Sequence, residues 1–226
     1  MFKLENIEIA FIVTAFNEEK TISKVVNDCI NFGDVFVIND CSADNTLQQI
    51  KRLNVKYINN SKNLGYEKSL FKCLNYAHSY SNYNYFITID GDRQFNLNSI
   101  KLAIEEINEN KLFISSIRNN KNRWIEIFID KLFYFLFKIN DPLSGLKIYS
   151  RKIIDQSNNV NLNGLLGMNI ILFCIIKKIK IHQFKIDINP REGNSTFGGI
   201  FKSNTYIIIS LLKFFYKYIL FKNNNI

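Results

Sequence analysis

The sequence predicts one α/β domain built on a mostly parallel central sheet with helices on its faces. Short apolar runs alternate with helical patterns through the first half of the chain, and such alternation is typical of βαβ units. The 226 residues suffice for one domain with a substantial core, and hydrophobic residues make up 47% of them. The chain contains no internal repeat and no linker rich in Pro, Gly or Ser.

The first elements follow directly from the apolar spacing. Ile7–Val13 ("IEIAFIV") is an apolar run of strand length. Glu18–Ile30 has apolar residues at 22, 25, 26, 29 and 30, the spacing of a helix. Val35–Asn39 predicts a second strand, Ala43–Leu53 a helix with an acidic first turn, and Val55–Asn59 a third strand.

The same alternation continues to about residue 116. Glu67–Tyr80 predicts a helix and Tyr85–Asp90 ("YFITID") a buried fourth strand. A helix at Leu97–Asn110 and a strand at Leu112–Ser116 follow. In parallel sheets flanked by helices, ligands bind outside the carboxyl ends of the strands. We therefore expect the residues that follow each strand to form the functional site.

Two aspartates follow the fourth strand at a spacing that suits a metal ion. Asp90 and Asp92 flank Gly91, which lets the backbone approach a ligand, and Gln94 adds a neutral oxygen. Mg²⁺ and similar hard cations take such oxygen ligands together with substrate phosphates. A simple Asp-Gly turn is the alternative interpretation of this motif.

Polar residues also follow the first two strands. Asn17 and Glu18 open one helix, and Asp40, Ser42 and Asp44 precede the next. Each alone is typical of a helix cap. Three polar strand ends on one edge predict a site for the base, ribose and diphosphate of a nucleotide.

These motifs resemble a known family in their order and spacing. "TAFNEE", "VINDCSADNT" and "IDGDRQF" are similar to the nucleotide-sugar half of family-2 glycosyltransferases, which have the GT-A fold, with "DGD" at the D-x-D metal motif. The resemblance implies Mg²⁺ or Mn²⁺ on Asp90, Asp92 and Gln94. It implies a donor site made of Thr14, Phe16, Asn17, Glu18, Ile38, Asp40, Ser42, Asp44, Asp90, Gly91, Asp92 and Arg191.

The second half resembles one branch of that family, the dolichol-phosphate mannose synthases. "SSIR" (115–118), "DPLSGLKIYSR" (141–151) and "REGNS" (191–195) are similar to segments of that branch. The resemblance implies that Arg191 clamps the diphosphate and that Arg118 and Arg123 position an acceptor phosphate. Asn39 stands where that family usually has the first Asp of an Asp-Asp pair. The resemblance therefore implies that Asp40, the retained acid, recognises the base.

The implied activity is a metal-dependent, inverting hexosyl transfer. The donor would be GDP-mannose or a UDP-sugar, and the acceptor a polyprenyl or dolichyl phosphate, with Asp92 among the catalytic groups. A same-fold enzyme acting on a sugar hydroxyl in lipopolysaccharide or capsule assembly is the alternative. That reaction needs a catalytic base, for which Asp141 is the one plausible candidate in the second half.

Charge and aromatic content bear on the partners. The net charge of +9 favours an anionic partner, although a compositional bias toward lysine explains it equally well. No nucleic-acid-binding motif is present, so nucleic acid is not expected. The four cysteines have no C-x-x-C spacing, which argues against a zinc knuckle.

Two apolar segments predict contact with a membrane surface. Trp124–Ile139 is either an interfacial helix or a helix buried on the sheet, and Tyr206–Phe221 carries Lys213 and Lys217 on an amphipathic pattern. Gln156–Ile176, which asparagines and glycines interrupt, and Tyr206–Phe221 are not expected to span a bilayer. We expect a domain at 1–205 and an amphipathic C-terminal helix at 206–226. We expect a cytoplasmic protein or one peripheral to the cytoplasmic membrane face, with a separate membrane anchor or homo-oligomerisation as further options.

Overall fold

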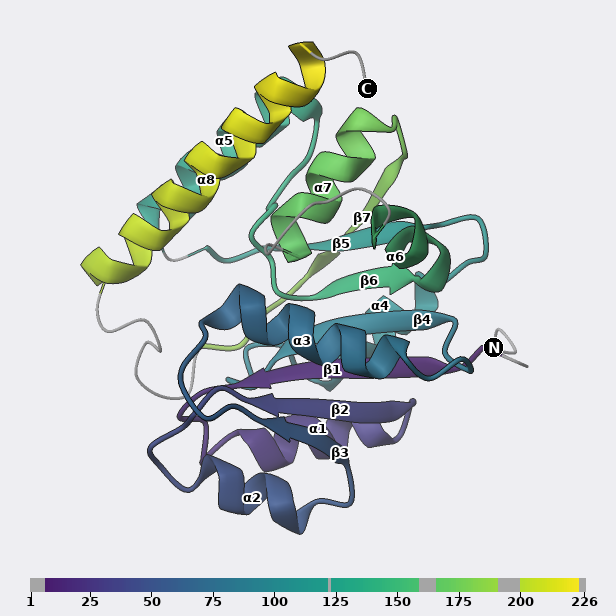
Figure 1. The fold of residues 1–226 in the computed structure, drawn as a ribbon, viewed down its shortest axis with the longest axis vertical. Helices are drawn as coiled ribbons and strands as arrows, with labels where there is room; N and C mark the ends of the chain where they lie inside the picture. The colour runs from purple at the N-terminus through teal and green to yellow at the C-terminus, as the bar shows by residue number, and fades with distance from the viewer. Residues whose placement is uncertain (1–6, 122, 159–165, 191–199, 224–226) are drawn as a thin grey trace.

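The computed structural model describes residues 7–121, 123–158, 166–190 and 200–223. Its centre is a seven-stranded sheet in the order β3-β2-β1-β4-β6-β5-β7 (Figure 1). Neighbouring strands run parallel except where β6 pairs with β4 and with β5. The predicted fold class, a mostly parallel sheet between helices, is confirmed.

The first half of the chain follows the predicted alternation closely. The strands are β1 (Ile9–Ala15), β2 (Asp34–Asn39), β3 (Lys56–Asn59), β4 (Tyr85–Asp90) and β5 (Phe113–Arg118). The helices are α1 (Ile22–Ile30), α2 (Thr46–Arg52), α3 (Tyr66–His78) and α4 (Leu97–Glu105). The helix expected to reach Asn110 ends earlier, at Glu105, and α1 and α2 begin later than predicted because polar loops precede them.

The second half contains elements that the sequence patterns did not predict. They are β6 (Lys147–Ser150), α6 (Arg151–Asn158), α7 (Leu166–Ile176) and β7 (Ile181–Ile186). The helices α5 (Trp124–Phe137) and α8 (Ile200–Asn223) correspond to the two apolar segments. The α8 helix begins before the predicted boundary at 206.

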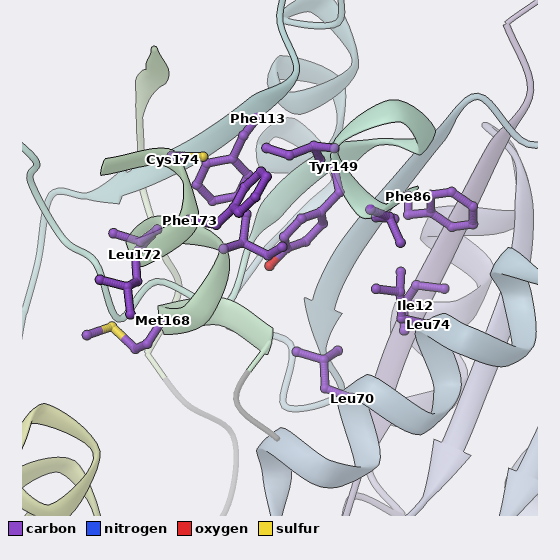
Figure 2. Packing of buried hydrophobic residues seen from close by; sticks show 14 of the residues in the cluster. Ile12, Leu70, Leu74, Phe86, Phe113, Tyr149, Met168, Leu172, Phe173 and Cys174 are labelled. Atoms are coloured by element: carbon purple, nitrogen blue, oxygen red, sulfur yellow. The ribbon is translucent and has the colours of Figure 1, made fainter. Parts of the chain in front are cut away.

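Apolar side chains fill both faces of the sheet. On one face, the buried residues of β1 and β4 meet α3, α6 and α7, with Tyr149 and Phe113 at the centre (Figure 2). On the other face, Ile87 and Ile148 pack toward the helices α1, α2 and α4. Alternate residues of each strand thus point to opposite cores, as the two-residue period of a strand requires.

The α5 and α8 helices lie side by side at the periphery of the fold (Figure 1). Their contact is aromatic: the ring centroids of Phe133 and Phe214 are 5.0 Å apart, and those of Phe137 and Tyr218 are 5.3 Å apart. Both Phe133 and Phe214 belong to the main core. The α8 helix is therefore packed on the domain's own core through at least this face.

The outer sides of this helix pair are apolar and exposed. We call the α5–α8 surface the set Trp124, Ile127, Phe128, Tyr134, Phe135, Leu136, Ile208, Ile209, Leu212, Tyr216, Ile219 and Leu220, all exposed. The helix at Trp124 is thus buried on one side and exposed on the other; its contact with a membrane surface stays a prediction. Among the described residues, no helix has the length and apolarity to cross a bilayer.

Candidate active site

The polar strand ends predicted from the sequence meet at one edge of the sheet. In the register of the parallel strands, Thr14 of β1 lies opposite Asp90 of β4, and Ala15 lies opposite Asn39 of β2. Backbone hydrogen bonds extend this pairing beyond the strands, from Gly91 N to Thr14 O and from Asp40 N to Ala15 O, both 2.9 Å. We call this the carboxyl edge. Asp40 and Asp90 follow strands that flank β1 on either side.

Asp90 points to the α3 side of the sheet and lies against two residues. Tyr66, the first residue of α3, lies beside its carboxylate. Burial, followed by the charge of Asp90, raises the pKa of Tyr66 well above its ordinary value. On its other side the carboxylate contacts Gly145, where a Cβ atom would lie 2.8 Å from the Asp90 Cγ.

Asp92 and Gln94 shape the turn after β4. Asp92 is 5% exposed and accepts a hydrogen bond from Gln94 N at 3.1 Å. Between them, Arg93 has a positive φ of 61°. The carbonyl oxygen of Gln94 accepts a hydrogen bond from Asn189 N at 2.9 Å, which ties this turn to the segment after β7. The predicted metal ligands thus occupy one turn at the carboxyl edge.

Asn17 and Ser42, two of the predicted donor-binding residues, join two loops to each other. Asn17 N donates to the Ser42 hydroxyl, and the Asn17 side-chain oxygen accepts from Ala43 N, both at 2.9 Å. Asn17 also has a positive φ of 56°, which asparagine tolerates better than most residues. The Ser42 hydroxyl and the Asn17 side-chain oxygen thus join the two loops, and their predicted contact with a donor stays a prediction.

Glu18 and Asp44 have the same kind of role. Glu18 N donates to the Thr46 hydroxyl at 2.7 Å, and the Glu18 carboxylate accepts from Thr21 at 3.1 Å. Asp44 accepts from Thr46 N at 3.0 Å and from Glu19 N at 3.2 Å. Asp44 therefore fixes the first residue of α2 and links it to the loop before α1, while the N-cap of α2 is Asn45, whose side chain makes no capping hydrogen bond.

Ile38 and Asp40, at the carboxyl end of β2, are both buried. The Ile38 side chain is fully buried in the core, so only its backbone can contact a ligand. The Asp40 carboxylate, predicted to recognise the base, is 5% exposed and accepts three hydrogen bonds from the segment between β3 and α3. Of the remaining donor-site residues at this edge, Phe16 is half-buried and Thr14 is buried.

Arg118 and Asp141, both predicted as catalytic, form a buried ion pair. The guanidinium donates two hydrogen bonds to the carboxylate at 2.8 Å, and Arg118 N adds a third at 2.9 Å. Arg118 also lies 3.3 Å from the Glu126 carboxylate. Burial pushes the pKa of Asp141 up, but the hydrogen bonds and charge of Arg118 outweigh it and hold that pKa below its ordinary value.

This pairing changes what the two residues can do. An ionised carboxylate with a depressed pKa is a weak base, which opposes the role of Asp141 as a catalytic base in the alternative reaction. Arg118 keeps its charge, but its Nε and Nη2 atoms already donate hydrogen bonds to Asp141. Arg123, the second predicted acceptor ligand, precedes α5 and lies 4.0 Å from Glu126. Arg191 lies outside the described residues.

The sequence analysis missed a buried lysine beside this pair. Lys147, the first residue of β6, is 5% exposed and donates to the backbone oxygen of Ser144. Burial lowers the pKa of Lys147 to about 8, and the charges of Glu67 and Asp141 raise it in part. Its only signal in the sequence was a lysine after "SGL", inside a motif that was already noted. Its burial depends on long-range pairing of β6 with β4.

The fold and these strand ends define an α/β protein whose polar site lies at the carboxyl edge of a mostly parallel sheet. Residues 10–177 match the family described as Glycosyl transferase family 2. The chain therefore belongs to glycosyltransferase family 2.

A curated relative and several solved structures are similar to this chain. An uncharacterized protein of Methanocaldococcus jannaschii is 36% identical over an alignment of 112 residues, and the match covers 45% of this chain and 49% of that protein. The match thus spans about half the length of that relative. The glucosyl-3-phosphoglycerate synthase of Mycobacterium tuberculosis, solved with Mn²⁺, UDP and glucosyl-3-phosphoglycerate, has a TM-score of 0.71 at 14% identity. That likeness covers 92% of this chain and 79% of the synthase.

The same synthase was solved with Mn²⁺ and UDP-glucose, with a TM-score of 0.68, 15% identity and coverage of 92% and 78% of the two chains. At this level of identity the likeness shows the fold alone, which is the GT-A arrangement expected from the motifs. The family and the fold are therefore established. The branch resembling dolichol-phosphate mannose synthases stays a prediction.

Proposed function

We propose that this protein is a metal-dependent, inverting glycosyltransferase that moves a hexose from a nucleotide-diphosphate sugar to a polyprenyl phosphate. The single observation that carries the proposal is that Asp90, at the carboxyl edge, lies near Arg118 and Lys147, with Asp92 in the turn that follows, in a chain of glycosyltransferase family 2. Acidic oxygens for a cation and buried positive charge for phosphates thus occur together.

The donor half of the proposal is supported by family membership and by the neighbours. The Mycobacterium tuberculosis synthase is described in complex with Mn²⁺ and UDP-glucose. In this chain the corresponding donor would be a GDP- or UDP-sugar. Its diphosphate would lie near the turn of Asp92 and Gln94, where the carboxyl ends of β1 and β4 are adjacent.

The residues present fit a Mg²⁺ or Mn²⁺ ion that is completed by substrate. Among the described residues there is no cluster of three or more His, Cys, Asp or Glu side chains that would enclose a metal by itself. Mg²⁺ in phosphate-binding sites usually takes one or two carboxylates together with phosphates and waters. Asp90, Asp92 and Gln94 would hold the ion, which supplies charge stabilisation to the leaving diphosphate.

The acceptor half is supported by the position of the apolar helices. The segment that carries Arg118 and Arg123 leads directly into α5, and α5 contributes to the exposed α5–α8 surface. Exposed Lys131, Lys138 and Lys213 accompany the apolar residues. Such a combination is typical of helices that lie in the headgroup region of anionic bilayers. A lipid phosphate bound beside Arg118 and Arg123 would then lie at the level of the bilayer headgroups.

The proposed reaction needs little help from a base. The acceptor phosphate is already anionic at neutral pH, so its oxygen attacks the anomeric carbon while the bond to the diphosphate breaks and the nucleoside diphosphate leaves. Attack from the opposite side inverts the anomeric centre. Transfer to a sugar hydroxyl, the alternative, requires a base, and the depressed pKa of Asp141 weighs against it. The lipid-phosphate acceptor is therefore preferred.

One experiment tests both halves of the proposal. Purified protein with Mn²⁺ or Mg²⁺ is incubated with GDP- and UDP-sugars, with and without a polyprenyl phosphate, and products are separated by thin-layer chromatography and mass spectrometry. We expect a glycolipid from one donor, lost on chelation and in Asp92→Asn. Asp28→Asn, on α1 away from the carboxyl edge, is the matched control. Transfer to free sugars but never to the lipid would refute the proposed acceptor.

A further inference from the structure

We propose that Asp40 is a positioning residue that holds the start of α3, and through it the Tyr66–Asp90 contact, and that it does not read the nucleotide base. This inference rests on the proposed function, because it assigns a role within the same donor site. It replaces the expectation that Asp40 recognises the base.

The Asp40 carboxylate is already engaged by the chain itself. Its Oδ1 accepts from Asn60 Nδ2 at 2.9 Å and from Leu64 N at 2.8 Å. Its Oδ2 accepts from Gly65 N at 2.9 Å. A carboxylate offers about four lone-pair positions, so three of them are occupied in a side chain that is 5% exposed. A base approaching from solvent would find one acceptor position and almost no accessible surface.

Asn60, the residue that braces Asp40, is itself fixed from several directions. Asn60 is 3% exposed, and its Nδ2 also donates to the Ser69 hydroxyl at 3.0 Å. Its side-chain oxygen accepts from Lys72 Nζ at 2.8 Å. Its backbone N donates to Asn39 O at 2.9 Å. The end of β2, the end of β3 and the first turns of α3 are thereby joined around one buried carboxylate.

The contacts continue from Asp40 to Asp90 through two consecutive residues. Gly65, held by Asp40, has a positive φ of 84°, a conformation that glycine adopts without strain. Tyr66 follows it as the first residue of α3, and its side chain lies beside Asp90. A shift of Gly65 therefore moves the side chain that lies beside the first acid of the "DGD" turn. Asp40 acts on the donor site by fixing this backbone.

The test separates positioning from base recognition by comparing nucleotides. The affinities of UDP, GDP and ADP are measured by calorimetry with Mn²⁺ for the wild type, Asp40→Asn and Asn60→Ala. Lys68→Ala, exposed on α3, is the control. Hydrogen exchange of the Leu64 and Gly65 amides, followed by NMR, reports the segment directly.

We expect Asp40→Asn to weaken the binding of all three nucleotides by about tenfold or more. The ratios between the affinities for UDP, GDP and ADP should not change. Asn60→Ala should weaken the binding of all three nucleotides equally, by a smaller factor than Asp40→Asn. Both variants should accelerate exchange of the Gly65 amide, and Lys68→Ala should change neither quantity. A more than tenfold change in the ratio of UDP to GDP affinity in Asp40→Asn alone would overturn the proposal.

Failure of the proposed function would look different. If the wild type binds no nucleotide, the donor assignment fails, while exchange of the Leu64 and Gly65 amides still decides whether Asp40 holds this segment. If Asp40→Asn does not fold, as circular dichroism would show, Asn60→Ala carries the comparison. Unchanged Gly65 exchange in a folded Asn60→Ala would then refute the positioning role.

Discussion

The carboxylate of Asp90 occupies the space that a side chain at Gly145 would need. A Cβ atom on Gly145 would lie 2.8 Å from the Asp90 Cγ and 2.9 Å from its Oδ1, closer than such atoms pack. The Gly145 carbonyl is also fixed, because the Thr88 hydroxyl donates to it at 2.7 Å. The glycine in "SGL" is therefore required by the first acid of "DGD".

We accordingly expect Gly145→Ala to displace Asp90 from its contact with Tyr66. Sugar transfer should fall by about tenfold or more, which corresponds to about 1.4 kcal/mol in the activation barrier, while the melting temperature drops by only a few degrees. Gly167→Ala is the matched control, since a Cβ there would lie 3.6 Å from the nearest atom, at ordinary contact distance. Full activity in Gly145→Ala would show that the Asp90 orientation is not needed.

The Arg118–Asp141 pair should be strongly coupled in stability. Replacing one partner of a buried ion pair leaves an uncompensated charge and costs about 3–5 kcal/mol. The single variants Arg118→Met and Asp141→Leu should each show this loss in urea unfolding, and the double variant should lose much less than their sum. Strict additivity would mean that the two side chains do not interact in solution.

The same pair should make stability depend on acidic pH. The folded-state pKa of Asp141 is held below its unfolded value by Arg118. Its contribution is therefore present at neutral pH and is lost as the pH falls below the unfolded value of about 4 and through the folded pKa. The fall in unfolding free energy at acidic pH should be smaller in Asp141→Asn than in the wild type. An identical acid dependence in both would contradict this assignment.

Lys147 should make stability depend on alkaline pH. Burial lowers its pKa from 10.5 to about 8, so the folded state disfavours the charged form. Stability should therefore rise as the pH increases from about 8 toward 10.5. Between about pH 7.5 and about pH 9.5 the gain is about 2 kcal/mol. Lys147→Met should lack this gain, and the exposed-site variant Lys68→Met should keep it; equal slopes in all three proteins would contradict burial of the charged group.

The α5–α8 surface should contribute to binding of anionic vesicles. Phe135 is 77% exposed and Leu212 is 65% exposed, so Phe135→Ser with Leu212→Ser should reduce co-sedimentation several-fold without loss of stability. Leu102→Ser on α4, at an exposed leucine away from this surface, is the control. Deletion of α8 is a poorer test, because Phe214 is buried in the core. Unchanged sedimentation of the double variant would assign this surface to another partner.

The parts of the fold that were predicted correctly are those with a local signature. The strand Tyr85–Asp90 was predicted with both of its ends, because an apolar run stops abruptly at a polar turn. The four-residue strand β6 was missed, because Lys147–Ser150 is too short to show a period and pairs with β4, more than fifty residues earlier. Periodicity reports only near neighbours in the chain.

The site shows the same limit at the level of single side chains. Residue types at strand ends indicated that Asp40, Asp90 and Asp92 would gather at one edge, and the register of the strands confirms it. The partners of each side chain could not be predicted. Asp40 takes its donors from a segment twenty or more residues away, and Arg118 at the end of β5 meets Asp141 in the loop before β6. Such contacts depend on the assembled fold.

The antiparallel seam between β4 and β6 bears on how chains of this architecture diversify. Backbone hydrogen bonds pair β4 with β6 along that seam and survive most side-chain replacements, although the contacts of Gly145 with Thr88 and Asp90 also cross it. Everything up to the "DGD" turn lies on one side of it, and the segments carrying Arg118, Asp141 and the outer helices lie on the other. Drift or exchange in the later segments can therefore produce new specificities while the earlier ones are inherited unchanged.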